Sequence, residues 1–320
     1  MSLAGHDHAW REWREALAGP RLHHGWILSG RRGIGKAAFA LAAARELVAV
    51  EGVPQPRGGH PDIIVLEPLP ATAEDEKKRE EGKDYNRKRN ISVDQVRAMQ
   101  QRLTTRPTLG PRRAIIVDPA DDLEKAAANA LLKSLEEPPA GSHFLLVTHR
   151  LGRLLPTIRS RCRLLPFAPL NAQAIDAVLR AHRPEAEAED RAAAIASSGG
   201  SPGMALDFLG LGLAPMHRLM EVIAREGDPT LARRGLLAET FGPRPDRPRQ
   251  LAAIDLARAV VAARMRTTPR EDLCVLAEAH AELVRLAAQA PTYNFDPGLP
   301  VMEIGGLLAR IAAPREAAHG

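Results

Sequence analysis

The residues best suited to chemistry form a glycine-rich loop near the start of the chain. Residues 30–37 read GRRGIGKA, with a short apolar run before them and a helical pattern after them. In that setting a GxxxxGK loop binds phosphate, because its backbone N–H groups and the helix N-terminus face the anion while the lysine reaches the outer phosphates. We therefore assign nucleotide phosphate binding to Gly30, Gly33, Gly35 and Lys36; the alternative is a tight turn with an exposed lysine.

Two groups that nucleotide hydrolysis needs are missing around this loop. Ala37 has a methyl group where a Ser or Thr hydroxyl would ligate Mg²⁺. Asp118 follows the apolar run 114–117 and is a further candidate for the nucleotide site, but Pro119 stands where a glutamate would align the attacking water. Phosphoryl transfer depends on placing the metal and the nucleophile. We therefore expect weak or vestigial binding of ATP or ADP, no required cofactor, and no hydrolysis.

The elements that must position these residues alternate along the first half of the chain. Short apolar runs separate longer helical patterns, which is typical of βαβ units around a parallel sheet. The expected strands cover residues 26–28, 63–66, 114–117, 144–147 and 163–165. The expected helices cover residues 36–50, 92–103 and 122–137. The phosphate loop then lies between the first strand and the helix that follows it.

The second half of the chain is helical in pattern. After Phe167 we predict three short helices, the third with Ser201 as its N-cap and Pro202 at its first position. The first two lie near residues 172–182 and 187–197. From about residue 211 an Ala/Leu/Arg-rich helical pattern runs to the end, with breaks at 242–245 and 291–300. The predicted fold class is therefore α/β plus all-α, with domains at residues 1–167, 168–210 and 211–320.

Composition sets the cellular compartment that we expect. The chain has 320 residues, a formal charge of +5, and two cysteines, Cys162 and Cys274. Two cysteines build neither a disulfide framework nor a four-thiolate zinc site, which favours a reducing, cytoplasmic setting. No apolar run approaches the roughly 18 residues of a membrane span, so no membrane association is expected. The mild positive excess permits contact with nucleic acid without demanding it.

Residues 74–90 are the most charged part of the chain. They read EDEKKREEGKDYNRKRN, with six acids and seven bases. Because the two signs nearly cancel, a solvated, flexible loop is favoured over a segment that contacts DNA.

A longer and more specific motif follows the third expected strand. Residues 128–139 read ANALLKSLEEPP, and they are joined by RPTLG at 106–110 and SRC at 160–162. With these runs the sequence resembles the bacterial clamp-loader family, and together they match its delta-prime branch across residues 20 to about 210. The resemblance implies an AAA+ ATPase-like domain, a three-helix lid and a helical collar for the three predicted domains. In this family five subunits form an open ring, which loads the sliding clamp onto primed DNA.

The resemblance also implies a role for Arg161. Members of this branch do not hydrolyse ATP, and the arginine of their Ser-Arg-Cys motif projects into the ATP site of a neighbouring subunit. Guanidinium suits that task because it is always ionised and binds oxygens in pairs. We therefore expect Arg161 to act in trans and the isolated chain to be inactive; a surface arginine or a salt bridge within its own domain is the alternative. In an extended segment Arg159 would share its face.

The resemblance also implies binding partners for this chain. They are the gamma/tau ATPase subunits, the delta subunit, the sliding clamp and primer-template DNA, within the DNA polymerase III holoenzyme. The helix that begins at Val93 faces the duplex in this family, which makes Arg97 and Arg102 candidates for contact with DNA phosphates. Exposed helical arginines without that role are the alternative. An ATP-hydrolysing subunit of the gamma/tau type is the alternative for the whole chain.

Three departures from the family pattern bear on this reading. A zinc module of four cysteines is common after the first helix, but residues 51–60 contain none, so no zinc is expected. The lid arginine that senses nucleotide in the ATPase relatives has no counterpart at residues 200–204. Lys36, by contrast, is retained, which is why weak nucleotide binding stays open.

Glu136 and Glu137 lie in the last helical turn before Pro138. The dipole of a helix disfavours negative charge at this end. The pair is tolerated there if it is solvated; we expect instead a polar contact, either within the domain or with a neighbouring subunit.

Overall fold

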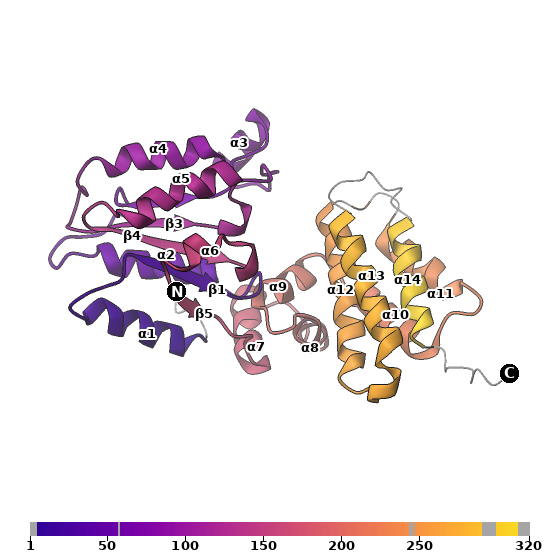
Figure 1. Ribbon diagram of the computed structural model, residues 1–320. Helices are drawn as coiled ribbons and strands as arrows, with labels where there is room; N and C mark the ends of the chain where they lie inside the picture. The colour runs from indigo at the N-terminus through magenta and orange to yellow at the C-terminus, as the bar shows by residue number, and fades with distance from the viewer. Residues whose placement is uncertain (1–4, 57, 243–244, 246, 290–298, 313–320) are drawn as a thin grey trace. The chain divides into compact units, whose positions relative to one another are not determined.

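The computed structural model of the protein describes residues 5–56, 58–242, 245, 247–289 and 299–312 (Figure 1). Packing divides the chain into two compact units, Met1–Leu170 and Asn171–Gly320. The second unit contains the helices of both the predicted lid and the predicted collar. The division of the chain into three domains therefore stays a prediction.

The first unit is built on a five-stranded sheet in the order β2-β3-β4-β1-β5. Every neighbouring pair is parallel, and β1 lies between β4 and β5 with Trp26 level with Leu145 and Arg163. The strands are β1 (Gly25–Ser29), β2 (Ile63–Leu66), β3 (Arg113–Val117), β4 (Ser142–Thr148) and β5 (Arg163–Pro166). All five predicted strands are present and parallel, so the predicted fold class is confirmed.

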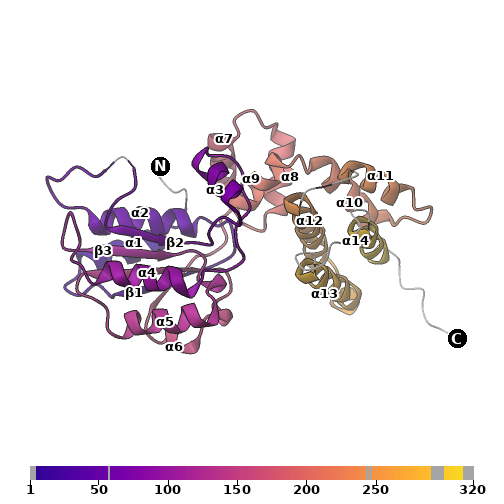
Figure 2. The same ribbon diagram turned by 90° about the horizontal axis from the view of Figure 1, so that it is seen from above.

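Helices cover both faces of this sheet (Figures 1 and 2). On one face lie α1 (Asp7–Ala18) and α2 (Lys36–Val48); on the other lie α4 (Val93–Leu103), α5 (Lys125–Glu136) and the short α6 (Pro156–Arg159). Alternate residues of β1 point to opposite faces, so Trp26 packs with α1 and α2 while Ile27 packs with α4 and α5. Each fully buried Ile, Leu or Phe contributes about 1.5–3 kcal/mol. The apolar cores on the two faces of the sheet therefore fix the strands, and with them the loops at the strand ends.

Helix α1 was not expected from the sequence. It buries Trp13 completely, with the Trp13 and Trp26 rings edge to face at 5.5 Å. Trp10 packs against Phe39 of α2, with ring centroids 4.3 Å apart. Ala9 and Trp13 are four residues apart and therefore lie on one side of the helix. That side packs into the core on this face of the sheet.

The charged segment after β2 differs from the predicted flexible loop. It contains α3 (Ala73–Glu80), whose N-cap Thr72 accepts a hydrogen bond from the Asp75 N–H. The buried Asp75 carboxylate accepts from the Thr72 hydroxyl at 2.7 Å and from the Asn86 N–H at 3.0 Å. These local bonds order the segment although most of its charges remain exposed, and a count of charges could not reveal them.

The second unit consists of helices in its described residues, as predicted. They are α7 (Ala172–His182), α8 (Ala188–Ser197), α9 (Pro202–Gly210), α10 (Ala214–Glu226), α11 (Ala232–Phe241), α12 (Arg247–Met265), α13 (Leu273–Gln289) and α14 (Leu299–Arg310). Ser201 caps α9 by accepting from the Met204 N–H at 3.3 Å, and Pro202 is the first helical residue, which confirms that prediction.

The two breaks expected in the helical pattern of the predicted collar lie partly outside the described residues. The first lies between α11 and α12, where residues 243–244 are not described. Most of the second, residues 291–298, also lies outside the described residues, and α14 begins at Leu299, inside the predicted break. Among the helices of the described residues, none has the length and apolar character needed to span a membrane.

Candidate functional site

The phosphate loop lies where the sequence predicts it, between β1 and α2. Gly33 and Gly35 have φ of +73° and +105°, in the region that favours glycine. A Cβ on Gly30 would lie 2.6 Å from the Phe167 carbonyl oxygen, so this position also requires glycine. The three glycines therefore shape a turn at the carboxyl edge of the sheet, with the N-terminus of α2 at its end.

Lys36 is bound by its own loop. The residue is 3% exposed, and Nζ donates hydrogen bonds to the carbonyl oxygens of Gly30 at 2.7 Å and Arg31 at 2.6 Å. Burial lowers the pKa of Lys36 to about 8, and the charges of Asp118 and Asp121 oppose that shift. A phosphate that reached this ammonium group would have to replace contacts with the loop.

Of the acids that follow β3, Asp118 and Asp121 differ in what they contact. Asp118 is partly buried, and burial raises the pKa of its carboxyl group while Lys36 lowers it. The Asp121 carboxylate accepts from the Thr148 hydroxyl at 2.6 Å and from the backbone N–H groups of His149 at 2.5 Å and Arg150 at 3.3 Å. Asp121 therefore holds the end of β4, and its oxygens are already engaged.

His149 joins the loop's surroundings without having been singled out in the sequence. It follows β4 directly, and its buried Nδ1 has no hydrogen-bond partner among the described residues. Burial, with a smaller effect from the charge of Lys36, lowers the pKa of His149 to about 4. Its place at a strand's carboxyl end was the one signal in the sequence that could have found it.

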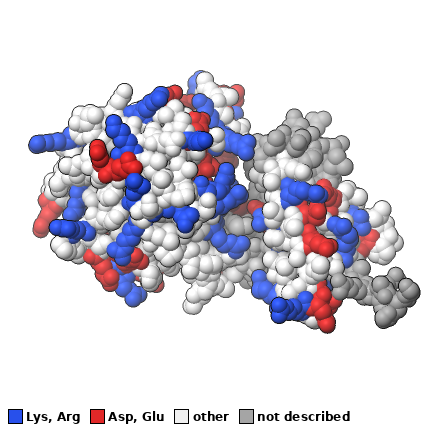
Figure 3. All heavy atoms as spheres, in the orientation of Figure 1, with Lys and Arg blue, Asp and Glu red and all other residues white. Residues whose placement is uncertain are grey.

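Arginines border the same edge of the sheet. Arg153, Arg32 and Arg150 lower the pKa of Asp122, against the larger effect of burial, which raises it. Elsewhere on the first unit, Figure 3 shows Lys and Arg side chains spread over the visible face with Asp and Glu among them. The described residues contain no group of three or more His, Cys, Asp or Glu that could hold a metal ion.

Arg161 lies at the opposite edge, in the turn between α6 and β5. Its Nη1 donates to the Thr157 carbonyl at 3.0 Å and the Ser160 hydroxyl at 3.3 Å, and its Nη2 lies 2.7 Å from the Glu136 carboxylate. Its side chain is 36% exposed. The contact expected for Glu136 is therefore present within the domain.

The neighbours of Arg161 fix the turn. Cys162 is partly buried, and burial raises the pKa of its thiol to about 12, so it acts as a packing residue. A Cβ on Gly25 would lie 2.8 Å from the Cys162 Sγ, which brings this turn close to the start of β1. Arg159 is exposed and ends α6, so the extended segment in which it would share a face with Arg161 is not present.

The phosphate loop and Arg161 are separated by the length of the strands. Gly30 follows the carboxyl end of β1, whereas Arg161 precedes the amino end of β5, and the two strands are parallel neighbours. Their paired levels from Trp26 to Ser29 cover about 10 Å of sheet. The chain therefore keeps its phosphate loop and its Arg161 on different edges.

Arg97 and Arg102 lie on α4, which begins with a capping box between Ser92 and Gln95. Arg97 is exposed and its Nη1 lies 3.5 Å from Asp94. Arg102 donates to the Pro61 carbonyl at 3.1 Å. Five residues correspond to about 140° around a helix. The two arginines therefore do not share one face.

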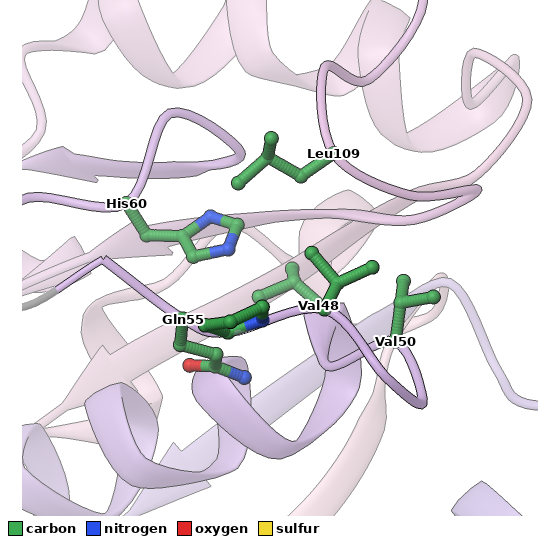
Figure 4. Close-up of a pocket in the computed structure, with 7 residues that line it drawn as sticks. Val48, Val50, Gln55, His60 and Leu109 are labelled. Carbon is green, nitrogen blue, oxygen red and sulfur yellow. The ribbon is translucent and has the colours of Figure 1, made fainter.

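Apolar contacts and hydrogen bonds hold the segment after α2 against its surroundings. Val48, Val50, Gln55, His60 and Leu109 line a small hollow there, together with Val53 and Pro54 (Figure 4). The Gln55 amide donates to the Arg45 carbonyl at 2.9 Å, and the His60 Nδ1 accepts from the Asp62 N–H at 3.1 Å. These contacts lie in the part of the chain where relatives were expected to hold zinc.

A parallel sheet with a phosphate loop after its β1 strand, followed by a helical unit, defines a P-loop protein of the α/β plus all-α class. A solved structure agrees: the DNA polymerase III gamma subunit-related protein of Thermotoga maritima superposes with a TM-score of 0.52, at 18% identity, over 96% of this chain and 100% of that one. The family described as "DNA polymerase III, delta subunit" matches residues 5–171. The chain belongs to that family.

Two relatives named DNA polymerase III subunit delta' illustrate the similarity. The protein of Pseudomonas aeruginosa is 35% identical over 220 residues, which is 63% of this chain and 62% of that protein. The protein of Escherichia coli is 36% identical over 201 residues, 58% of this chain and 54% of that protein. The matches thus span less than two thirds of these relatives. The resemblance to the delta-prime branch is confirmed.

Proposed function

We propose that this chain is a clamp-loader subunit of DNA polymerase III that donates Arg161 to the ATP site of a neighbouring ATPase subunit. The observation that carries the proposal is the separation of Arg161 from the chain's own phosphate loop. The two lie at opposite edges of one parallel sheet. An arginine in that position lies away from a phosphate held in the chain's own loop, which supports action on a phosphate of another subunit, where its charge would stabilise the transferred group.

The chain's own loop supports the second part of the proposal, that this subunit does not hydrolyse ATP. Ala37 offers no oxygen to Mg²⁺, and Pro119 offers no carboxylate to water. Asp121, the next acid, is engaged with the end of β4. The chain therefore lacks the side chains that would position a metal ion and an attacking water for hydrolysis.

Nucleotide has a minor part in this proposal. The glycine turns and Lys36 retain the elements of a phosphate cradle, which supports weak binding of ATP or ADP without a catalytic consequence. No cofactor is required, zinc included.

The partners follow from the family. We infer a heteropentameric ring with the gamma/tau and delta subunits, acting in the cytoplasm on the sliding clamp and primer-template DNA. Within that ring α4 would face the duplex, and the exposed Arg97 supports this better than Arg102, which is engaged with Pro61.

The test uses a complex reconstituted with its neighbouring subunits. Arg161→Ala is expected to lower the DNA- and clamp-stimulated ATPase while the complex still assembles. Arg11→Ala, which removes one exposed arginine from α1, is the matched control and is expected to leave turnover unchanged. Unchanged turnover in Arg161→Ala refutes the donated arginine, and turnover by the isolated chain above that of a Lys36→Ala variant favours the gamma/tau-type alternative.

A further inference from the structure

Glu136 stands at a helix end that does not favour it. It is the last residue of α5, where the carbonyl end of the helix dipole repels negative charge. The Glu136 carboxylate meets Nη2 of Arg161 at 2.7 Å, so the guanidinium compensates both the carboxylate and the helix end. Glu136 and Arg161 are 25 residues apart in the sequence, so this contact joins the end of α5 to the turn before β5.

Both partners are fixed by the same core. Leu135, directly before Glu136, is buried, and its carbonyl is 3.0 Å from the His24 Nε2 at the start of β1. Ile158, just before the Arg161 turn, is buried in the cluster that contains Leu135. The pair is therefore held by packed elements on either side rather than by two mobile ends.

The contacts of Arg161 use only part of its donors. Nη1 donates hydrogen bonds to Thr157 and Ser160, and Nη2 forms an ion pair with Glu136. Within the described part of the chain, Nε has no hydrogen-bond partner. A guanidinium carries five N–H donors in a rigid fork, so the Nε–H and an Nη2–H remain for the oxygens of a phosphate.

We propose that Glu136 is a positioning residue for Arg161, holding the guanidinium so that these two donors meet a phosphate of the neighbouring subunit. The inference rests on the proposed function. It differs from a simple surface salt bridge because its effect appears in turnover rather than in stability. A pre-oriented arginine loses less side-chain freedom when the phosphate arrives.

The first test measures ATP turnover in the reconstituted complex. Glu136→Ala is expected to lower kcat by about twofold to fivefold, the range that a half-exposed ion pair supports, and to leave KM for ATP unchanged. Glu136→Gln keeps one acceptor oxygen and is expected to lie between Glu136→Ala and the unaltered protein. Glu137→Ala, which removes the neighbouring exposed carboxylate, is the control and is expected to be neutral.

A double variant separates this inference from the proposed function. Adding Glu136→Ala to Arg161→Ala is expected to cause no further loss, because the glutamate acts only through the arginine. A further loss, or unaltered kcat in Glu136→Ala beside a clear loss in Arg161→Ala, overturns the positioning role alone. Unaltered kcat in Arg161→Ala overturns both proposals.

The isolated full-length chain gives a second readout that needs no partner. In protein labelled with ¹⁵N-arginine, the Nε–H signal of Arg161 is identified by its absence from Arg161→Ala. We expect restricted motion of this group in the unaltered chain and greater mobility in Glu136→Ala. Equal mobility in the two proteins overturns the positioning role whatever the outcome in the complex.

Discussion

Asp62 holds together two segments that frame the sheet, and its replacement by asparagine should destabilise the first unit strongly. The residue is fully buried before β2, and its carboxylate accepts from the backbone N–H groups of Thr108 at 2.6 Å and Leu109 at 2.8 Å. The Arg113 guanidinium, itself 5% exposed, lies 3.8 Å from the same carboxylate. Thus the Arg-Pro-Thr-Leu-Gly motif is tied to the start of β2 and β3.

Asp62→Asn keeps one acceptor oxygen and places an N–H₂ group where the other was. One backbone N–H then loses its partner, at about 1–3 kcal/mol, and Arg113 loses its buried counter-charge. Removing one partner of a buried pair costs about 3–5 kcal/mol, part of which the Arg113 contacts with backbone carbonyls offset. We expect a loss of about 2–4 kcal/mol in the free energy of unfolding of this unit.

Tryptophan fluorescence during urea unfolding measures this effect in the right unit. All three tryptophans, Trp10, Trp13 and Trp26, lie in the first unit, so the helical unit does not contribute to their signal. Asp84→Asn, at an exposed position, is the matched control and should change stability by less than about 0.5 kcal/mol. A loss below about 1 kcal/mol in Asp62→Asn would refute the reasoning, since the backbone bonds would then be dispensable.

Three further predictions concern the phosphate loop and the segment after α2. Burial lowers the pKa of Lys36 to about 8, so affinity for ADP should fall as pH rises through that value; in titration calorimetry the fall should be absent from Lys36→Ala. The native protein binds this proton less well than the unfolded chain, so stability should rise with pH from about 8 to 10.5. In the segment after α2, the melting temperature should not change with EDTA. Val48→Asp should lower it in thermal unfolding followed by fluorescence, because Val48 lines this hollow and is 4% exposed, so the substitution buries a carboxylate. A chelator-sensitive melting temperature would contradict that view.

The strands were predictable because their residues are apolar on both faces. The run from Ala114 to Val117, between Arg113 and Asp118, is such a case. Short apolar runs that alternate with helical patterns along the chain indicate buried strands of a parallel sheet. Helix α1 was missed because its apolar positions contact a sheet that forms far along the chain. The ordered segment around α3 was missed because one buried carboxylate, Asp75, outweighs what the charge count indicates.

The candidate site was predictable only where a contiguous motif marks it. Gly30 to Lys36 and the Ser-Arg-Cys run around Arg161 are such motifs, and the structure places them as expected relative to the strands. Asp121 contacts Thr148, 27 positions away, Glu136 contacts Arg161, 25 positions away, and His149 lies near Lys36, 113 positions away. Their roles depend on strand order and on which strand ends meet, and local sequence patterns do not specify those.

The retention of Lys36 needs no nucleotide to explain it. A buried ammonium group without partners would be costly, yet here two loop carbonyls bind it and Asp118 and Asp121 lie near enough to favour its charge. Replacing it would leave the Gly30 and Arg31 carbonyls without their donor, beside two acids that had lost a cation. Lys36 therefore links the Gly30 and Arg31 carbonyls of the loop in the absence of phosphate. A phosphate loop can thus keep its lysine after losing its metal ligand, while the function proposed here moves to Arg161 at the other edge of the sheet.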